Sequence, residues 1–190
     1  MRVIAGDAKG KTLKLVPGKG TRPITDKVKG ALFNILGWRV PDARMLDMFA
    51  GTGSVGIEAL SRGAEKVVFC ETASKAVRVI RDNLAHTELD EWAQVLHTDA
   101  FAYVAGCNEV FDIIYVAPPQ YRGMWSRAME ALDERALLAP DGVIVVQIFP
   151  KEFEDLPLQH LTLTDQRTYG STMLCFYEPS AETGPPDPPR

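Results

Sequence analysis

Apolar residues follow two different rhythms along this chain. Segment 66–71 reads KVVFCE and is apolar over its central four residues, which is typical of a strand buried on both faces of a parallel sheet. In segment 74–87, by contrast, Val77, Ile80 and Leu84 recur at intervals of three and four residues and therefore share one face of a helix. Strands that alternate with helices in this way predict an α/β fold with a doubly wound, mostly parallel sheet.

The same alternation continues from residue 44 to residue 178. At the end of this region, two segments lie on either side of Gly170, and we expect them to pair as antiparallel strands. Strands are predicted at 44–49, 66–71, 93–99, 111–116, 142–148, 161–169 and 171–178, and helices at 54–63, 74–87 and 124–138, with a short helix or turn at 100–106.

Residues 1–40, here named the basic lead-in, follow a different pattern. Segments 2–6 and 11–15 are short and alternating, and they predict a hairpin with Gly10 in its turn. Thr25 then precedes a helix as its N-cap. The apolar positions of that helix are Val28, Leu32, Ile35 and Leu36.

The length of 190 residues and a hydrophobic content of 46% predict one domain with one sizeable core. We expect three parts: the lead-in at 1–40 as a small hairpin and helix extension, the α/β domain at 41–178, and a tail at 179–190. The tail holds five of the chain's 13 prolines, which predicts disorder.

Charge is distributed unevenly between these parts. The lead-in carries nine Lys or Arg and two Asp, a net charge of +7, although the whole chain has a net charge of −4. A basic segment on an acidic body predicts contact with a polyanion such as RNA. A solvated basic arm with no partner is the alternative.

Other compositional features narrow the class of protein. An odd number of cysteines, three, without C-x-x-C spacing favours reduced thiols in the cytoplasm. The N-terminus lacks the apolar core of a signal peptide, and no apolar run reaches membrane-spanning length. The three histidines are scattered without ligand spacing. We therefore expect a cytoplasmic monomer with no membrane segment and no metal site.

A glycine motif follows the first predicted strand of the α/β domain. Gly51, Gly53 and Gly56 form G-x-G-x-x-G before a helix, and the acidic Glu71 ends the next strand. Such glycines allow a tight turn and close approach of a ligand, and the acid can accept ribose hydroxyls. A tight turn without a ligand is the structural alternative, but the order of strand, loop, helix, strand and acid predicts a nucleotide-like cofactor.

Acidic residues indicate which cofactor this loop selects. Asp47 lies four residues before Gly51, where a pyrophosphate would rest on the helix N-terminus, and a carboxylate there repels phosphate. It suits the ammonium and sulfonium of S-adenosylmethionine (SAM). Asp99 ends the third strand and is placed to face an adenine amino group. An NAD-linked oxidoreductase, which the glycine spacing permits, is the alternative that Asp47 opposes.

At these residues the chain resembles class I SAM-dependent methyltransferases, and more closely the RsmD family of bacterial small-subunit rRNA guanine-N2 methyltransferases. The most specific stretch is 21–36, TRPITDKVKGALFNIL, because the glycine loop is shared by many methyltransferases. The other matching stretches are MRVIAG at 1–6, the segment from 46 to 71, the double proline, and YGSTMLCFYE at 169–178.

The resemblance implies a Rossmann-like, seven-stranded methyltransferase sheet whose last pair is antiparallel. It implies a small-subunit rRNA or ribosomal particle as partner, reached through the basic lead-in, and SAM bound over the glycine loop. In this family Glu71 would take the ribose and Asp99 the adenine, and Arg22, Pro23 and Thr25 would line the entrance. The expected cofactor-binding residues are Asp47, Phe49, Gly51, Gly53, Glu71, Asp99, Arg22 and Thr25.

The segment YVAPPQY, residues 115–121, departs from the family pattern. Enzymes that methylate exocyclic amines end the fourth strand with Asp or Asn, two prolines and an aromatic, which accept the amine N–H groups and stack on the base. Here the residues are Ala117, Pro118, Pro119, Gln120 and Tyr121. Either Gln120 and a main-chain carbonyl replace the missing acceptor while Tyr121 stacks, or the protein has another target or only binds. A merely rigid loop is the structural alternative.

The leading hypothesis is therefore methylation of the exocyclic N2 of a guanine, by direct transfer and without a covalent enzyme intermediate, because no cysteine lies on a predicted active-site loop. The catalytic candidates are Ala117, Pro118, Pro119, Gln120 and Tyr121. A catalytically altered module that binds SAM or RNA is the alternative from a different class, and Ala117 is the residue that supports it.

Overall fold

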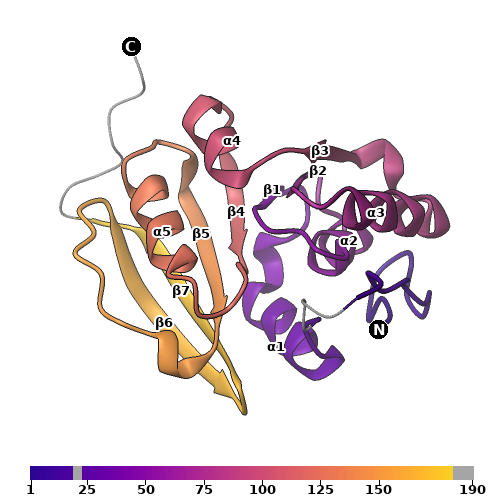
Figure 1. Cartoon of the computed structure of the whole chain (residues 1–190), viewed down its shortest axis with the longest axis horizontal. Helices are drawn as coiled ribbons and strands as arrows, with labels where there is room; N and C mark the ends of the chain where they lie inside the picture. The colour runs from indigo at the N-terminus through magenta and orange to yellow at the C-terminus, as the bar shows by residue number, and fades with distance from the viewer. Residues whose placement is uncertain (19–22, 182–190) are drawn as a thin grey trace.

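A computed structural model describes residues 1–18 and 23–181 of the chain, and within them seven strands form one sheet in the order β3-β2-β1-β4-β5-β7-β6 (Figure 1). Strands β1 to β5 are parallel, whereas β7 is antiparallel to both β5 and β6. The strands are β1 (Arg44–Asp47), β2 (Lys66–Glu71), β3 (Ala93–His97), β4 (Phe111–Val116), β5 (Leu138–Ile148), β6 (Leu161–Tyr169) and β7 (Thr172–Pro179). The predicted seven-stranded α/β architecture is confirmed.

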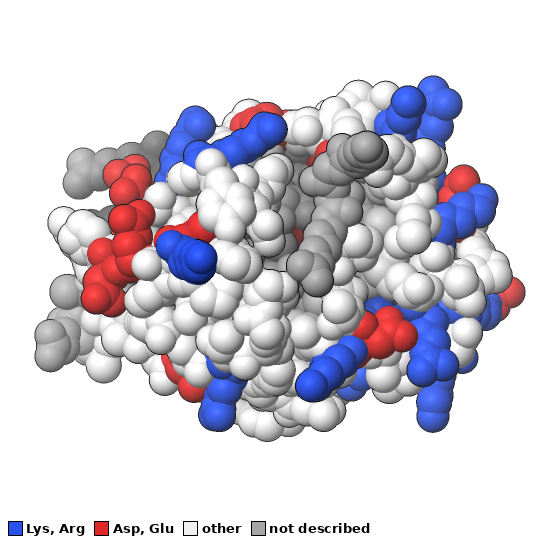
Figure 2. Space-filling view, turned by 60° about the horizontal axis from the view of Figure 1, so that its bottom comes forward, with Lys and Arg blue, Asp and Glu red and all other residues white. Residues whose placement is uncertain are grey.

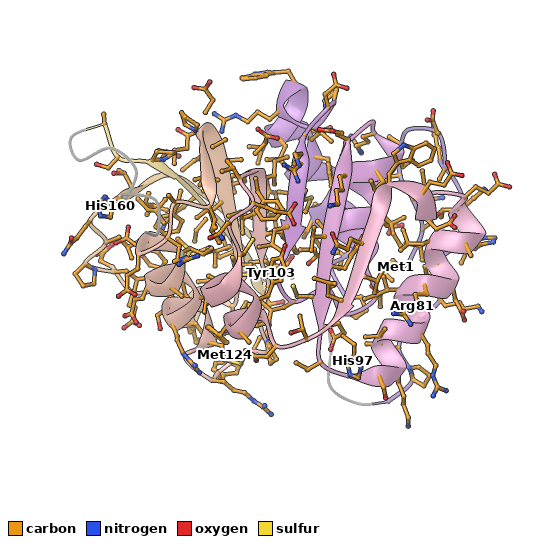
Figure 3. The ribbon with its side chains drawn as sticks, turned by 90° about the horizontal axis from the view of Figure 1, so that it is seen from above. Met1, Arg81, His97, Tyr103, Met124 and His160 are labelled. Atoms are coloured by element: carbon orange, nitrogen blue, oxygen red, sulfur yellow. The ribbon has the colours of Figure 1, made fainter. Side chains whose placement is uncertain are left out.

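Helices cover both faces of this sheet. The α-helices are α1 (Asp26–Leu36), α2 (Ser54–Ser61), α3 (Ser74–Thr87), α4 (Ala100–Gly106) and α5 (Met124–Asp133), and the 3-10 helices are η1 (Gly37–Arg39), η2 (Asp90–Trp92) and η3 (Pro150–Glu152). Residues of α1, α2 and α3 share one buried cluster, and residues of α4 and α5 share a second. In Figure 3, Tyr103 of α4 and Met124 of α5 accordingly lie on the same side of the sheet.

The predicted helix at 124–138 is too long. Helix α5 ends at Asp133, and Leu137 and Leu138 lead into β5 instead. The Phe111 N–H donates to the Leu137 carbonyl at 2.8 Å, so this segment is bound to the edge of β4 before the regular strand begins. Tertiary hydrogen bonding has therefore overridden the helical spacing of the apolar residues.

The start of the lead-in forms the predicted hairpin, although its arms are too short to make regular strands: the Val3 N–H donates to the Lys11 carbonyl and the Leu13 N–H to the Met1 carbonyl, each at 3.0 Å. A single bridge joins Arg2 to Thr12, and Gly10 takes a positive φ of 86° in the turn. Ile4 and Ala5 donate their N–H groups to the Glu58 carboxylate of α2, at 2.8 and 3.0 Å. The Glu58 side chain thus satisfies backbone N–H groups of this hairpin in addition to the bonds between its two arms.

Helix α1 begins as predicted, but its buried face is rotated. The Thr25 hydroxyl accepts a hydrogen bond from the Val28 N–H at 3.3 Å, as an N-cap does. The buried residues of α1 include Lys29 and Phe33, whereas Ile35, expected on the apolar face, is 39% exposed. The rotation brings Lys29 into the core beside α2.

Lys29 forms a fully buried ion pair with Glu58. The Lys29 Nζ lies 3.4 Å from the carboxylate, and both side chains are 0% exposed. Lys29 also donates to the Arg2 carbonyl at 2.7 Å and to the Ser54 hydroxyl at 2.9 Å. Burial lowers the pKa of Lys29, and the attraction of Glu58 opposes that shift. The pair therefore joins the hairpin of the lead-in, helix α1 and the first residue of α2.

Half of the lead-in's other positive charges also meet carboxylates of this same chain. The lead-in pairs are Arg2 with Asp26, Lys11 with Glu88, Lys14 with Asp82, Lys29 with Glu58, and Arg39 with Glu178. Five of its nine Lys and Arg thus have a partner within the molecule. Exposed pairs of this kind contribute little stability each, but they reduce the charge that is free for a polyanion.

At the other end of the chain, β7 extends to Pro179, and the Ser180 N–H donates to the His160 carbonyl at 2.7 Å. The predicted tail at 179–190 therefore overlaps the sheet at its beginning, and residues 182–190 lie outside the described residues. Among the described residues, no helix has the length and apolar character needed to cross a bilayer, and no group of three or more His, Cys, Asp or Glu forms a metal site.

Replacing Lys29 by alanine tests the buried pair. Lys29→Ala leaves Glu58 charged and buried without its amine partner, so we expect the free energy of unfolding to fall by roughly 3 kcal/mol. Urea denaturation followed by circular dichroism measures it. Lys27→Ala, on the exposed side of the same helix, is the matched control and should change stability by less than about 0.5 kcal/mol. Equal stability of the two variants would show that the pair contributes nothing.

Candidate active site

A cavity of about 770 Å³ opens at the edge of the sheet where the parallel strands end. Parallel strands bring their carboxyl ends to one edge, and ligands of doubly wound folds bind in the crevice there. The sequence-predicted residues that line it are Pro23, Asp47, Phe49, Gly51, Glu71, Asp99, Ala117, Pro118, Pro119 and Gln120. Residues separated by up to 97 positions in the sequence therefore meet at one cavity.

Three other predicted residues are described but are not among those lining the cavity. Gly53 precedes α2 with a φ of 76° and lies beneath the loop, against Ile80. Thr25 caps α1, and Tyr121 follows the double proline. Arg22 lies outside the described residues.

The glycine loop between β1 and α2 is closed by its own hydrogen bonds. The Gly51 N–H donates to Glu71 Oε2 at 2.9 Å, and the Gly53 N–H donates to the Ala50 carbonyl at 2.8 Å. Gly51 has a φ of 56°, in the left-handed region that glycine adopts without strain. Two N–H groups that would bind a phosphate in a dinucleotide site are thus already occupied.

Asp47 is the most unusual residue of the cavity. It ends β1, is 1% exposed, and its Oδ1 has no hydrogen-bond partner among the described residues. Burial raises the pKa of this carboxyl to about 7; a hydrogen bond from the Gly56 backbone opposes the shift, and the negative charge of Glu71 adds to it. A buried carboxyl with a vacant acceptor facing a cavity is suited to a cationic ligand.

The other two predicted acidic residues, Glu71 and Asp99, accept hydrogen bonds from backbone N–H groups. Glu71 accepts from the N–H groups of Gly51 and Ala73, at 2.9 and 2.8 Å. Asp99 caps α4 by accepting from the Ala102 N–H at 3.0 Å. A carboxylate offers about four lone-pair sites, so each acid retains acceptors for a ligand while its orientation is fixed.

The double proline, which follows β4, lines another part of the cavity than the glycine loop. Ala117 and Pro118 are half-buried, whereas Pro119 and Gln120 are exposed. The Tyr121 N–H donates to Glu152 Oε1 at 2.6 Å, and the Tyr121 ring lies 5.6 Å from that of Phe149 and is 66% exposed. The loop is therefore anchored to η3, and the Tyr121 ring lies outside the cavity lining.

Several polar residues of the cavity were missed from the sequence, and two of them come from the strands beyond β4. Gln147 of β5 and Thr172 of β7 both line it. The Tyr115 hydroxyl of β4 donates to Gln147 Oε1 at 2.5 Å. A signal was present, because Gln147 is the one polar residue in the apolar run 143–148, but only the strand order places it beside the double proline.

Cys70 also lines the cavity, from the end of β2. The sequence led us to expect no cysteine on an active-site loop, and strand β2 brings one to the site. Burial raises the pKa of the Cys70 thiol to about 12, with the negative charge of Asp47 as the next cause. The residue therefore stays a neutral thiol and is a poor nucleophile.

The family model described as conserved hypothetical protein 95 matches residues 1–178. Among curated proteins, ribosomal RNA small subunit methyltransferase D of Haemophilus influenzae is 32% identical over 94% of this chain and 93% of its own length. The same-named Escherichia coli protein is 33% identical over 77% and 74%.

The chain belongs to the RsmD family. A further relative, the candidate rRNA methyltransferase YlbH of Bacillus subtilis, is 40% identical over 94% of this chain and 98% of its own length. Among solved structures, the Escherichia coli candidate methyltransferase yhhF superposes with a TM-score of 0.84 at 30% identity, covering 96% of this chain and 99% of that one. The family resemblance and the class I methyltransferase fold predicted from the sequence are confirmed.

The third glycine of the G-x-G-x-x-G motif, Gly56 of α2, offers a test of the packing beneath the candidate site. A Cβ on Gly56 would lie 2.3 Å from the Phe69 ring, so we expect Gly56→Ala to lower the free energy of unfolding by about 1–3 kcal/mol through overpacking. Thermal and urea denaturation measure this change. Gly106→Ala is the control, since nothing lies within 4 Å of its added Cβ. A Gly56→Ala protein as stable as Gly106→Ala would contradict the close helix–sheet contact.

Proposed function

We propose that this protein is a SAM-dependent methyltransferase that transfers a methyl group to the exocyclic N2 of a guanine in small-subunit rRNA. Its family relatives in Escherichia coli and Haemophilus influenzae carry the name ribosomal RNA small subunit methyltransferase. The observation that carries the proposal is the buried Asp47 carboxyl, which lines the cavity and whose Oδ1 has no hydrogen-bond partner among the described residues.

Asp47 supports SAM over a dinucleotide. The methionine end of SAM carries an ammonium and a sulfonium, and no phosphate is present. An ammonium would satisfy the vacant Asp47 acceptor, whereas a pyrophosphate would meet a carboxylate and loop amides that already donate to Glu71 and Ala50. The oxidoreductase alternative is therefore disfavoured. In this proposal Gly51 and Phe49 flank the methionine end, while Gly53 supports the loop from below.

Glu71 and Asp99 would bind the nucleoside part of the cofactor. Both line the cavity with carboxylate oxygens fixed by backbone N–H groups, so little side-chain entropy is lost when a ligand binds. We assign Glu71 to the ribose hydroxyls and Asp99 to the adenine amino group, in the order in which their strands extend away from β1.

The methyl transfer itself needs a stronger nucleophile than a resting guanine amine. As the N2 lone pair forms the new N–C bond, the S–CH₃ bond breaks, its electrons remain on sulfur, and one amine proton leaves to solvent. The main-chain carbonyls of Ala117 and Pro118 and the side-chain oxygen of Gln120 are our candidate acceptors for the amine N–H groups. Pro119 stiffens the loop that carries them. Tyr121 would need to turn inward to stack on the base.

A catalytically altered module that binds SAM or RNA is the second candidate function. The specific observation in its favour is Ala117, whose side chain has no acceptor for the amine. Loss of such a group typically reduces the rate by about 10²-fold or more. The two candidates agree on the cofactor and differ in whether a methyl group leaves it.

In this proposal RNA contacts Lys and Arg side chains that form no ion pair within the described residues. Figure 2, which turns the bottom of Figure 1 forward, shows Lys and Arg side chains mainly toward the margins of that face. Lys9, Lys27 and Arg122 are exposed, and none of them forms an ion pair within residues 1–18 and 23–181. Arg122 also lines the cavity, which places one free cation beside the proposed base site.

The raised pKa of Asp47 predicts a pH dependence of cofactor binding. The group holds its proton below about pH 7 in the free protein, and an ammonium binds the ionised form. The affinity for S-adenosylhomocysteine should therefore rise roughly five- to tenfold from pH 6 to pH 7.5. Isothermal titration calorimetry measures it. Asp47→Asn should bind more weakly at both pH values, without this rise. A flat wild-type profile would contradict the assignment of Asp47 to the ammonium.

Methyl transfer is tested with labelled SAM on unmodified 30S particles and on naked small-subunit rRNA, followed by mapping of the methyl group. We expect label on a guanine N2. Gln120→Ala should reduce transfer by about 10²-fold while S-adenosylhomocysteine affinity stays unchanged.

Two results of that assay would change the assignment. Binding of SAM and RNA without any transfer would establish the binding module in place of the enzyme. Full activity of Gln120→Ala would show that this side chain is not the acceptor that replaces the missing carboxylate, and stabilisation by NADH but not by SAM in a thermal-shift assay would overturn the cofactor.

A further inference from the structure

Gln147 lies beside Ala117 on the neighbouring strand. Val116 of β4 pairs with Val146 of β5 in parallel register, so the next residues along each strand, Ala117 and Gln147, continue side by side. Both line the cavity. The position where the family pattern carries an acidic or amide side chain is thus an alanine here, and a carboxamide stands next to it.

Tyr115 fixes the orientation of this carboxamide. Tyr115 is buried, and burial raises the pKa of its hydroxyl well above the ordinary value, so the group stays protonated and acts as a donor. It donates to Gln147 Oε1 at 2.5 Å. Because the oxygen faces Tyr115, the Nε2 amide nitrogen is directed away from Tyr115. Nε2 makes no hydrogen bond within the described residues.

Gln147 therefore offers two functions at one place. Oε1 keeps a second lone pair, and Nε2 has free N–H donors. A carboxamide in this state pairs in a bidentate manner with a purine edge on which an amino group lies next to a ring nitrogen, as glutamine does with adenine. On guanine, the N2 amine and the neighbouring N3 form such an edge.

We propose that Gln147 is a catalytic and specificity-determining residue of this enzyme: its Oε1 accepts an N–H of the guanine N2 amine and its Nε2 donates to N3, in place of the side chain that Ala117 lacks. Tyr115 is a positioning residue that acts through Gln147. The inference rests on the proposed function, and it adds to the loop acceptors, which include the exposed Gln120, a second side chain that the sheet holds in a fixed geometry.

The contrast with Gln120 comes from burial and anchoring. Gln120 is exposed and follows two prolines, and no hydrogen bond of its side chain is present in the described part of the chain. Gln147 is half-buried on the central sheet and held by Tyr115. A preoriented group loses less side-chain entropy on binding and reaches the developing charge without rearrangement.

The test measures kcat and KM for methyl transfer to small-subunit rRNA. Gln147→Ala should lower kcat/KM by roughly tenfold to a hundredfold, the range of one bidentate base contact, with S-adenosylhomocysteine affinity close to wild type and the protein still folded by circular dichroism. Gln94→Ala, which removes a carboxamide from edge strand β3 outside the cavity lining, is the matched control and should leave kcat/KM unchanged.

Two further variants distinguish recognition from a structural effect. Ala117→Asp combined with Gln147→Ala supplies an acceptor at the neighbouring position and should restore most of kcat. Tyr115→Phe leaves the carboxamide present but unoriented, so its loss should be smaller than that of Gln147→Ala. Failure of the double variant to recover, with its cofactor affinity intact, would argue against the acceptor role.

The outcomes separate the inference from the function on which it rests. If wild-type protein methylates guanine N2 and Gln147→Ala does so within twofold of wild type, the role of Gln147 is refuted while the proposed function stands. If wild-type protein transfers no methyl group to either rRNA substrate although it binds SAM, the proposed function fails and the inference fails with it.

Discussion

The buried carboxylate of Glu58 is the interaction on which the arrangement of this molecule depends. It accepts hydrogen bonds from the N–H groups of Ile4 and Ala5 and, at 2.8 Å, from the Arg62 guanidinium. It also forms an ion pair with Lys29. Lys29 in turn bonds Ser54, the first residue after the glycine loop. A lead-in that appears in the sequence as a separate basic arm is thus part of the core that supports the glycine loop of the cavity.

The bounds of helices and strands were predicted best where the pattern of apolar residues was regular. The bounds of β2 and α3 agree with the predicted ranges, because β2 is one continuous buried run and the buried residues of α3 recur at helical spacing. The predicted end of α5 was wrong because the Leu137 carbonyl accepts from the Phe111 N–H, and the bond from Ile4 of the lead-in hairpin to Glu58 was not foreseen. Such pairings depend on tertiary contacts that no local pattern contains.

The residues of the candidate site also differ in whether a local pattern or a tertiary contact determines their position. The glycine loop and its acids could be predicted because they occupy fixed places in one strand–loop–helix–strand unit. Gln147 and Thr172 could not be placed, since their position at the cavity depends on strand order, with β5 beside β4 and β7 beside β5. The cavity consequently has an acidic end near β1 to β3 and an end near β4, β5 and β7 where the described lining carries amide, hydroxyl and guanidinium groups.

The internal pairing of the lead-in has a consequence for ionic strength. Binding to single-stranded nucleic acid releases counterions, and the logarithm of the affinity falls with that of the salt concentration by about 0.7 for each cation engaged. Five of the nine lead-in cations already neutralise this chain's own carboxylates. At most four remain to displace counterions from phosphates, so a lead-in docked in this way gives a salt dependence less than half as steep as its composition suggests, and shape must supply more of the discrimination.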